Sequence, residues 1–434
     1  MNLLVTNTRV GQAYFIIRAL RPYARKIVAT TYGEERFSRW NCHASYSRLV
    51  DQRYHVPSPV EDWRAGKIQR ENTESEEAYI QAVIKICEAE KIDTIFPSWD
   101  PQVYVFAKNK ERFERMGVLV PTPDYETVIM PLDKYRTIQA AQEVKFPCPR
   151  TYLPESEDDL RQIAEEAGFP LMIRPRFSSG ARGNKVVMNL HDLRDARETV
   201  KKNHGMLMVQ EFIPGKEKQQ FYLMVDRKGD CKVAFCPKTH RIYLRYPLNA
   251  STACECVPPH PYVTRATRLA QELGWWGGIT VQTKIDFRDG IPKLMEMNPR
   301  LGYHLWFRTE TGINEPLISL QIAQGADVQA IEQYPFGTMF LSPMEDVFGL
   351  SFWILDQVFY KCRTRILGKK PTDAFNAPMS LKEMVESFKQ TYSGGHEKIF
   401  DPHFRYFLQD PVVSILWWAK YFVHIVQTTK HLGE

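Results

Sequence analysis

Along residues 1–122, short apolar runs alternate with stretches whose apolar residues recur at helical spacing. Ile80, Val83 and Cys87, for example, fall on one face of a helix. The expected strands are 3–6, 26–30 and 94–97, and the expected helices are 14–20 and 78–89. Because strands and helices that alternate in this way build parallel sheets covered by helices, the segment predicts a parallel α/β unit.

The proline-rich stretch Pro121-Thr122-Pro123 predicts a domain boundary. The region that follows, 123–330, is expected to begin with a helix over 135–144 and to contain a smaller α+β unit over about 150–209. Its remaining part alternates strands with a helix over 263–273. The last segment, 331–434, is expected to be a mostly helical extension. A chain of 434 residues is too long for one ordinary core, so several packed units are expected.

Composition narrows the function classes. The formal charge is only +6 and the basic residues are spread along the chain, so no nucleic-acid surface is expected. The eight cysteines form no C-x-x-C pair, which favours reduced thiols in a cytoplasmic protein. The N-terminus lacks the pattern of a signal peptide. Residues 8–12 lack G-x-G-x-x-G, so a nicotinamide or flavin cofactor is not supported.

The stretch 171–183 joins an apolar strand to a loop rich in serine and glycine. Arg174 lies near the end of the strand, where its guanidinium can offer forked donors to a phosphate. Glycines permit close backbone approach, and free N–H groups with serine hydroxyls can surround phosphate oxygens. A simple hairpin with a glycine turn fits the same residues equally well. The candidate phosphate-binding residues are Arg174, Ser178, Ser179, Gly180 and Gly183.

A second candidate is the connector that follows the strand ending at Gln210. The backbone N–H and C=O groups of Glu211, Phe212 and Ile213 can read the edge of an adenine, and Glu217 can hold ribose hydroxyls. Taken alone, an exposed glutamate is more often only solvated.

The third piece is a hairpin whose strands run over 280–287 and 292–297 around the turn 288–290. Strand alternation puts Glu296 and Asn298 on one face, with Gln282 facing them from the neighbouring strand. Three oxygen-bearing side chains that converge in this way form a hard-cation site, such as one for Mg²⁺ beside a nucleotide. Arg300 follows on the same side, in position for a phosphate or a developing oxyanion. A structural polar network is the alternative.

The order of these motifs resembles that of the ATP-grasp superfamily over residues 1–325. The Arg174-Pro-x-Phe-x-x-Gly run and the spacing from Gln282 to Glu296, Asn298 and Arg300 are similar to the synthetase domains of the carbamoyl phosphate synthetase large subunit. The resemblance implies an α/β chain with a Rossmann-like pre-ATP-grasp domain over 1–122, an ATP-grasp domain over 123–330 and a helical C-terminal extension over 331–434. Residues 150–209 would then form a lid that closes over ATP.

The resemblance also implies the roles of individual residues. Lys134 and Arg174 would contact the phosphates, the 211–213 connector the adenine, and Glu217 the ribose. Gln282, Glu296 and Asn298 would bind magnesium, and Arg300 would face the transferred phosphoryl group. Two departures from the family pattern are Ala181, where a second glycine is common, and the bulky Arg182 beside it.

These roles predict an ATP- and Mg²⁺-dependent ligase that activates a small-molecule carboxylate as an acyl phosphate and transfers the acyl group to an amine. Two alternatives stay open: a carboxyphosphate or carbamoyl-type enzyme, and a nucleotide-binding protein without turnover. Arg241 and Arg245 are weaker candidates for contact with a second anion, because arginines in such a position are more often plain surface charges.

The extension contains two segments rich in large apolar residues, 348–360 and 412–426, and a basic cluster at 361–370. Such helices pack on the core or at a homodimer interface, which is the favoured interpretation. Aromatic residues beside basic ones also fit a peripheral membrane contact.

Overall fold

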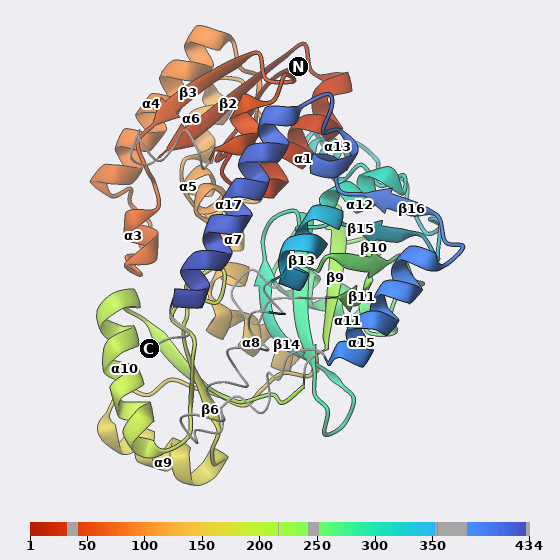
Figure 1. Ribbon diagram of the computed structural model, residues 1–434. Coiled ribbons are helices and arrows are strands. Elements are labelled where there is room, and N and C mark those ends of the chain that lie inside the picture. Colours follow the sequence, from red (N-terminus) through yellow and green to blue (C-terminus); the bar gives the residue numbers. More distant parts are fainter. Residues whose placement is uncertain (33–41, 216, 242–250, 352–353, 355–379, 431–434) are drawn as a thin grey trace.

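The computed structural model describes residues 1–32, 42–215, 217–241, 251–351, 354 and 380–430, with the backbone alone for Arg64 and residues 421–430. Its described strands form four sheets of four strands each. Figure 1 shows the N-terminal sheet at the top, a small sheet with two helices at the lower left, and the other two sheets on the right.

The N-terminal sheet is parallel throughout, in the order β3-β2-β1-β4. Its strands are β1 (Asn2–Val5), β2 (Lys26–Tyr32), β3 (Gln52–Val56) and β4 (Thr94–Phe96). Every residue of β1 and β4 is buried, because helices cover both faces of the sheet. The principal helices are α1 (Gly11–Leu20), α4 (Glu74–Glu90) and α5 (Asp100–Lys108). The alternation expected from the sequence is confirmed, and β3 is a strand that the pattern did not indicate.

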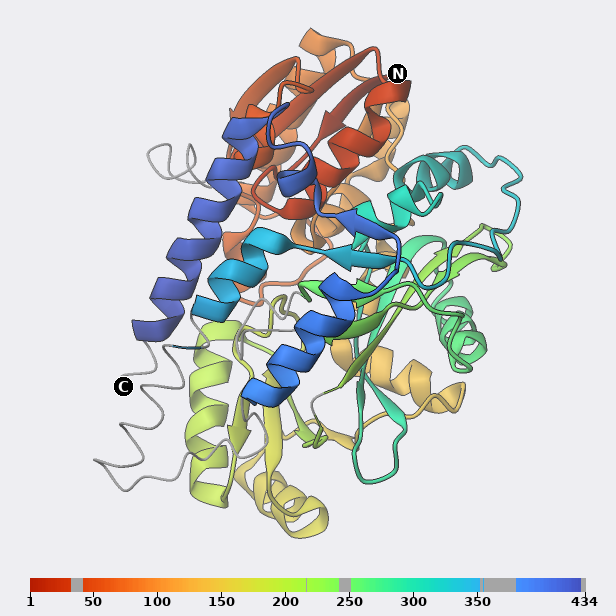
Figure 2. The same cartoon turned by 45° about the vertical axis from the view of Figure 1, so that its right-hand side comes forward.

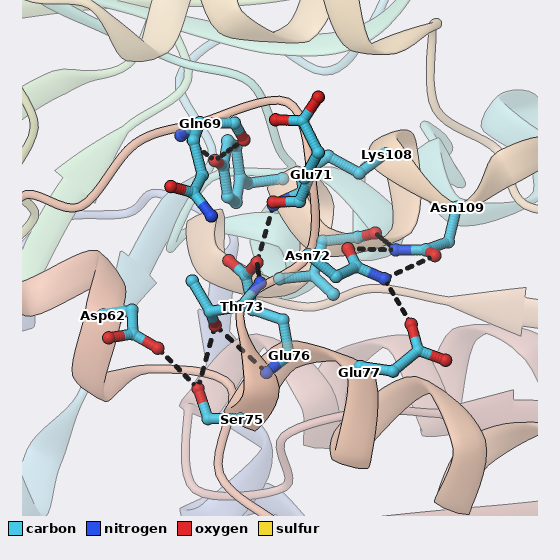
Figure 3. Close-up of polar contacts among 12 residues, drawn as sticks. Asp62, Gln69, Glu71, Asn72, Thr73, Ser75, Glu76, Glu77, Lys108 and Asn109 are labelled. Carbon is cyan, nitrogen blue, oxygen red and sulfur yellow. Dashed lines mark hydrogen bonds and ion pairs between the residues drawn. The ribbon is translucent and has the colours of Figure 1, made fainter.

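An ion pair is enclosed within this N-terminal unit. Lys108 Nζ lies 2.6 Å from Glu76 Oε2, and both side chains are only 1% exposed. Lys108 also donates to the carbonyl of Glu71 at 2.8 Å, while Thr73 and Glu76 cap the first turn of α4 through reciprocal hydrogen bonds. Figure 3 shows this network. The pair therefore joins α5 to the start of α4 inside the core.

The small sheet has the order β5-β8-β6-β7 and is antiparallel. Its strands are β5 (Thr151–Tyr152), β6 (Leu171–Pro175), β7 (Lys185–Val187) and β8 (Leu207–Glu211). The helices α9 (Glu157–Ala167) and α10 (Leu190–His204) pack their apolar residues against it to form a separate small core. This unit coincides with the region expected to form the lid, although the domain boundaries themselves stay a prediction.

The central sheet is also antiparallel, in the order β10-β9-β13-β14. Its strands are β9 (Lys218–Val225), β10 (Cys231–Phe235), β13 (Gly277–Ile285) and β14 (Pro292–Asn298). The hairpin predicted around residues 288–290 is the β13–β14 connection. Helices near this sheet include α7 (Tyr125–Leu132), α8 (Lys134–Glu143), α11 (Val263–Glu272) and α13 (Glu315–Ala323).

The fourth sheet joins the C-terminal extension to the rest of the chain. Its order is β11-β12-β15-β16, with strands β11 (Lys238–Arg241), β12 (Ala253–Glu255), β15 (Met339–Leu341) and β16 (Lys398–Phe400). The extension thus contains two strands in addition to its helices. Each of these strands is only three residues long, which is too short for an alternating pattern to be recognised in the sequence.

The long C-terminal helix α17 (Pro411–Lys430) lies alongside the N-terminal unit (Figures 1 and 2). Val413 is buried and Trp417 is nearly so, which supports packing on the core for this part of the extension. Most of the other predicted apolar segment, 348–360, lies outside the described residues. Among the described helices, none is long and apolar enough to cross a membrane.

The shorter helices of the described residues are α3 (Glu61–Arg64), α6 (Lys110–Arg115), α12 (Leu305–Glu310), α15 (Leu381–Phe388) and α16 (Pro402–Arg405). The 3₁₀ turns η1 (Arg21–Tyr23) and η2 (His43–Tyr46) lie in the N-terminal unit, and η4 (Lys389–Ser393) is a π-helical turn after α15.

Candidate functional site

Polar side chains form a row across three strands of the central sheet. Gln282 of β13 lies directly opposite Glu296 of β14 on one side and opposite Gln220 of β9 on the other. Directly opposed residues of an antiparallel sheet project on the same face, so the three side chains lie next to one another. Asn298 lies two residues further along β14 than Glu296, opposite Thr280. The hairpin therefore brings Gln282, Glu296 and Asn298 onto one face, as the sequence predicts.

Arg174 connects the small sheet to this row. Its guanidinium donates to Glu296 Oε2 at 3.1 Å through Nη2, and to the carbonyl of Met295 at 3.0 Å through Nη1. Nη1 also lies 3.3 Å from Gln210 Oε1 on β8. Arg174 is only 3% exposed, so this cation is buried between the two sheets. The strand β6 holds it there, because Leu171 and Ile173 of the same strand are fixed in the core of the small sheet and its two helices.

Lys134, the first residue of α8, lies against the loop that follows β6. Its ammonium donates to the carbonyl of Ser178 at 2.6 Å and lies 3.3 Å from the Ser178 hydroxyl. Asp133 caps α8 by accepting from the Tyr135 amide at 3.0 Å, and it also accepts from Arg176 Nε at 3.0 Å. The start of α8 is therefore fixed to the loop, which places Lys134 beside the candidate phosphate-binding residues.

Three cations surround the carboxylate of Glu296. Burial by itself would raise the pKa of Glu296, but Lys134, Arg174 and Arg300 outweigh it and lower the pKa below its usual value. Burial in turn lowers the pKa of Lys134 to about 8, against the opposite effect of Glu296. The region thus holds an excess of basic groups, with Lys134, Arg174 and Arg300 around the acidic side chains of Glu296 and Asp100. Such an excess is suited to a polyanion with bound divalent cations.

Arg300 lies between the central sheet and the N-terminal unit. Its Nε donates to Asp100 Oδ1 at 2.9 Å, and its Nη2 lies 3.3 Å from Asn298 Oδ1. Burial raises the pKa of Asp100, an effect that Arg300 opposes. The Thr280 Oγ1 atom is buried and has no hydrogen-bond partner among the described residues. The polar face therefore continues from Glu296 towards Arg300 with hydrogen-bonding capacity left for a ligand.

The predicted adenine connector runs from the small sheet to the central sheet. Glu211 ends β8; its amide donates to the carbonyl of Arg150 at 2.9 Å, and its carboxylate accepts from Arg288 at 2.7 Å. Phe212 and Ile213 are buried, at 8% and 3% exposure. Glu217 is exposed. The Glu211 side chain is thus engaged within the protein, and the assignment of adenine to 211–213 and of ribose to Glu217 stays a prediction.

The loop between β6 and β7 contains Ser178, Ser179, Gly180 and Gly183. It is a hairpin connection, since β6 and β7 pair antiparallel. Gly183 has φ +76°, and a Cβ there would lie 2.7 Å from the His204 ring and from Pro175. Only glycine fits this position, which fixes the path of the loop beside Lys134. A hairpin and a phosphate loop are therefore compatible interpretations of the same residues.

Three residues that the sequence motifs did not indicate belong to this region. Gln220 extends the polar row, Asp100 binds Arg300, and Lys218 lies two residues before Gln220, on the same face of β9. Burial lowers the pKa of Lys218 to about 8, and the charge of Glu296 acts in the opposite direction. The alternation of Lys218 and Gln220 along one strand is the signal that could have revealed these two residues, whereas Asp100 lies at the start of α5 and has no such signal.

The prediction that Arg241 is available for a second anion is wrong. Its side chain is buried and its Nε donates to Asp346 Oδ1 at 2.8 Å. It also donates to the hydroxyls of Ser387 and Thr391 at 3.0 Å, and its guanidinium lies 4.2 Å from the centre of the Phe388 ring. Arg241 therefore holds α15 and η4 against β11. Arg245 lies outside the described residues.

Parts of the chain match known protein families. Residues 133–331 match the family model "Carbamoyl-phosphate synthase L chain, ATP binding domain", and residues 72–121 match "PylC-like, N-terminal domain". The carbamoyl phosphate synthase large chain of Halomonas eurihalina is 26% identical over 233 residues, which cover 51% of this chain and 22% of that protein. A pyruvate carboxylase of Aspergillus terreus is 24% identical over 58% of this chain and 22% of its own length. The chain thus matches less than a quarter of the length of these relatives.

Solved structures share the fold. The biotin carboxylase domain of 2-oxoglutarate carboxylase from Hydrogenobacter thermophilus, a dimer in complex with MgADP, ADP and bicarbonate, has a TM-score of 0.60 at 18% identity. The similarity covers 78% of this chain and 73% of the biotin carboxylase chain. The L-amino acid ligase of Bacillus licheniformis has a TM-score of 0.55 at 17% identity, covering 74% of each chain.

The chain therefore has the ATP-grasp fold, and the resemblance to the ATP-grasp superfamily is confirmed. Residues 133–331 are similar to the ATP binding domain of the large chain of carbamoyl phosphate synthase. A homodimer of this chain stays a prediction.

Proposed function

We propose that the chain is an ATP- and Mg²⁺-dependent ligase that activates a small-molecule carboxylate as an acyl phosphate and transfers the acyl group to an amine. The observation that carries the proposal is the opposition of Gln282 and Glu296 in the β13–β14 register, with Arg174 bonded to Glu296 at 3.1 Å. This arrangement unites an oxygen-donor row with buried cations from the lid and from α8. A triphosphate with its metal ions needs both kinds of group within a few ångströms.

The donor set fits magnesium. Gln282, Glu296 and Asn298 offer two amide oxygens and one carboxylate on a single face, and hard divalent cations prefer oxygen ligands of this kind. Magnesium, when bound with ATP, would neutralise charge on the phosphate oxygens. One carboxylate contributes little charge by itself, so we expect the nucleotide phosphates to supply the remaining anionic ligands.

The protein residues then act mainly by position and charge. Lys134 and Arg174 bind the phosphate oxygens, and the 178–183 loop surrounds them. A carboxylate oxygen of the substrate attacks the γ-phosphorus, the bond to the β-phosphate oxygen breaks, and ADP leaves. The amine attacks the carbonyl carbon of the acyl phosphate, inorganic phosphate leaves, and the amine loses a proton. Arg300 stabilises the charge on the transferred phosphoryl group in both steps.

The lid unit excludes water from this centre. Arg174 projects from the lid onto Glu296. Closure of the small sheet therefore also carries the Arg174 guanidinium to the phosphates. Exclusion of water protects the acyl phosphate from hydrolysis.

A second candidate is a carboxyphosphate or carbamoyl-type reaction, in which bicarbonate takes the place of the organic carboxylate. The match of residues 133–331 to the carbamoyl phosphate synthase domain favours it. The fold is common to both reactions, so the reacting acid has to be identified by experiment.

The deciding experiment measures ADP release with MgATP and pools of carboxylic acids and amines, followed by the mass of the adduct. The ligase predicts ADP release that requires both an acid and an amine, and a product heavier than the acid by the amine minus water. Release that needs only bicarbonate would replace the ligase by the second candidate. ATP binding without ADP release for any acid, including bicarbonate, would contradict both.

A further inference from the structure

The segment Arg300–His304, which follows β14, is held by several separate parts of the chain, and three of the contacts involve Arg300, Gly302 and Tyr303. Arg300 binds Asp100 of the N-terminal unit at 2.9 Å. The backbone at Gly302 lies directly on Tyr222 of β9, because a Cβ there would be 2.0 Å from the tyrosine ring. The Tyr303 hydroxyl donates to Glu345 Oε1 at 3.1 Å. The third contact belongs to the C-terminal extension.

Glu345 is a buried acceptor that receives two donors on one oxygen. It lies in the helical residues 343–351 and is 2% exposed. Its Oε1 accepts from the Trp417 indole at 3.0 Å as well as from Tyr303, while its Oε2 has no partner among the described residues. A single carboxylate oxygen therefore joins α17 to the segment that carries Arg300.

Trp417 is itself firmly placed. Its ring stacks on His403, with centroids 5.0 Å apart and planes 9° from parallel, and it lies 4.7 Å from the His43 ring. A Cβ at Gly11 would come within 3.2 Å of the same ring. The indole N–H is thus fixed against α1 and η2 of the N-terminal unit, and it gives Glu345 a rigid point of attachment.

We propose that Glu345 is a positioning residue of the ATP-grasp centre, which ties the Arg300–His304 segment to the C-terminal helix α17 and so fixes the Arg300 guanidinium. The proposal rests on the proposed function only for what Arg300 contacts during turnover. Loss of the acceptor leaves the Tyr303 hydroxyl and the Trp417 indole without their shared partner. The segment is then held at Arg300 itself, at the Gly302–Tyr222 contact and at His304, whose Nε2 lies 2.8 Å from Ser251 Oγ. The Tyr303 side chain no longer restrains the backbone between these points, and the guanidinium gains freedom to move.

The test compares three variants with a matched control. Glu345→Ala removes the acceptor, Glu345→Gln keeps an acceptor oxygen, and Tyr303→Phe removes only one hydroxyl. Trp418→Phe is the control, since Trp418 is the next residue of α17 and its ring stacks on Phe407 instead. With the acid and amine that support ADP release, Glu345→Ala and Tyr303→Phe should lower kcat about ten-fold or more. The KM for ATP should change less than about two-fold, and Glu345→Gln should restore most of kcat.

A second measurement works whether or not the substrates are known. Hydrogen exchange followed by mass spectrometry should show amides 300–304 exchanging about ten-fold faster in Glu345→Ala and Tyr303→Phe than in the natural chain. Peptides from β9 should be unchanged, and Glu345→Gln and Trp418→Phe should match the natural chain.

The outcomes separate the two proposals. Absence of ADP release by the natural chain refutes the proposed function, whereas the exchange of amides 300–304 still decides the role of Glu345. Unchanged kcat and exchange in Tyr303→Phe would overturn that role, even if Glu345→Ala fails to fold. It would equally be overturned if Glu345→Gln were as impaired as Glu345→Ala, or if Trp418→Phe changed both readouts to the same extent.

Discussion

The carboxylate of Glu345 makes the stability of the protein depend on pH in a way that one substitution can isolate. Burial raises the pKa of Glu345 to about 7, opposed by the hydrogen bonds from Trp417 and Tyr303, while the charge of Asp346 raises it further. Its ordinary value is 4.5. At pH values between 4.5 and about 7, the Glu345 carboxyl is protonated in the folded chain and ionised in the unfolded chain. The free energy of unfolding therefore falls as the pH rises through this window, and below it the side chain has no effect.

The size of the effect follows from the difference of the two pKa values. One pKa unit corresponds to about 1.4 kcal/mol. Titration of Glu345 therefore lowers the free energy of unfolding by about 3 kcal/mol in total, once the pH is well above the folded-state pKa. Between pH 5 and pH 8 the two-state titration of this group amounts to about 2 to 3 kcal/mol. Glu345→Gln cannot titrate, so the variant should gain this amount relative to the natural chain over that interval.

The assay is urea unfolding of both chains at pH 5 and pH 8, with the comparison made at each pH. The difference between the two chains removes the titration of other buried groups such as Asp401, which is present in both. We expect the free energy of unfolding of the variant, relative to the natural chain, to rise by about 2 to 3 kcal/mol from pH 5 to pH 8. A difference that stays constant, or that moves in favour of the natural chain, would show that Glu345 is not held in an environment that disfavours its charge.

Three further predictions concern other residues. Glu296→Ala should lower ADP release at least about 100-fold, because it removes a preorganised carboxylate beside Arg174; near-normal release would contradict its assignment to the site. The KM for ATP should rise as the pH increases through about 8, the pKa to which burial lowers Lys134, because the neutral amine no longer attracts phosphate; a Lys134→Arg chain should lose this dependence. Lys108→Met should lower the free energy of unfolding by about 3 to 5 kcal/mol, since it leaves the buried Glu76 unpaired, and Glu76→Gln combined with it should recover part of the loss in denaturant unfolding.

The hairpin shows why part of the site could be predicted from the sequence. Gln282 and Glu296 lie on two strands joined by a short turn, so alternation along each strand and the register of one turn determine which side chains meet. The parallel order of the N-terminal unit follows from its alternating strands and helices in the same way. In each case the information lies within a contiguous stretch, where periodicity and turn chemistry act directly.

Other contacts were decided only by the tertiary structure. Arg174 and Glu296 are 122 residues apart, and Arg300 and Asp100 are 200 apart. No local pattern specifies such partners, because they depend on which faces of separately formed sheets pack together and on the cost of closing the intervening loops. The same reason explains Arg241, whose burial beneath α15 depends on residues more than a hundred positions later. The sequence by itself determined the hairpin strands and the oxygen donors Gln282, Glu296 and Asn298 on one face of them. Packing between distant elements decided which cations face these donors and which C-terminal contacts hold Arg300.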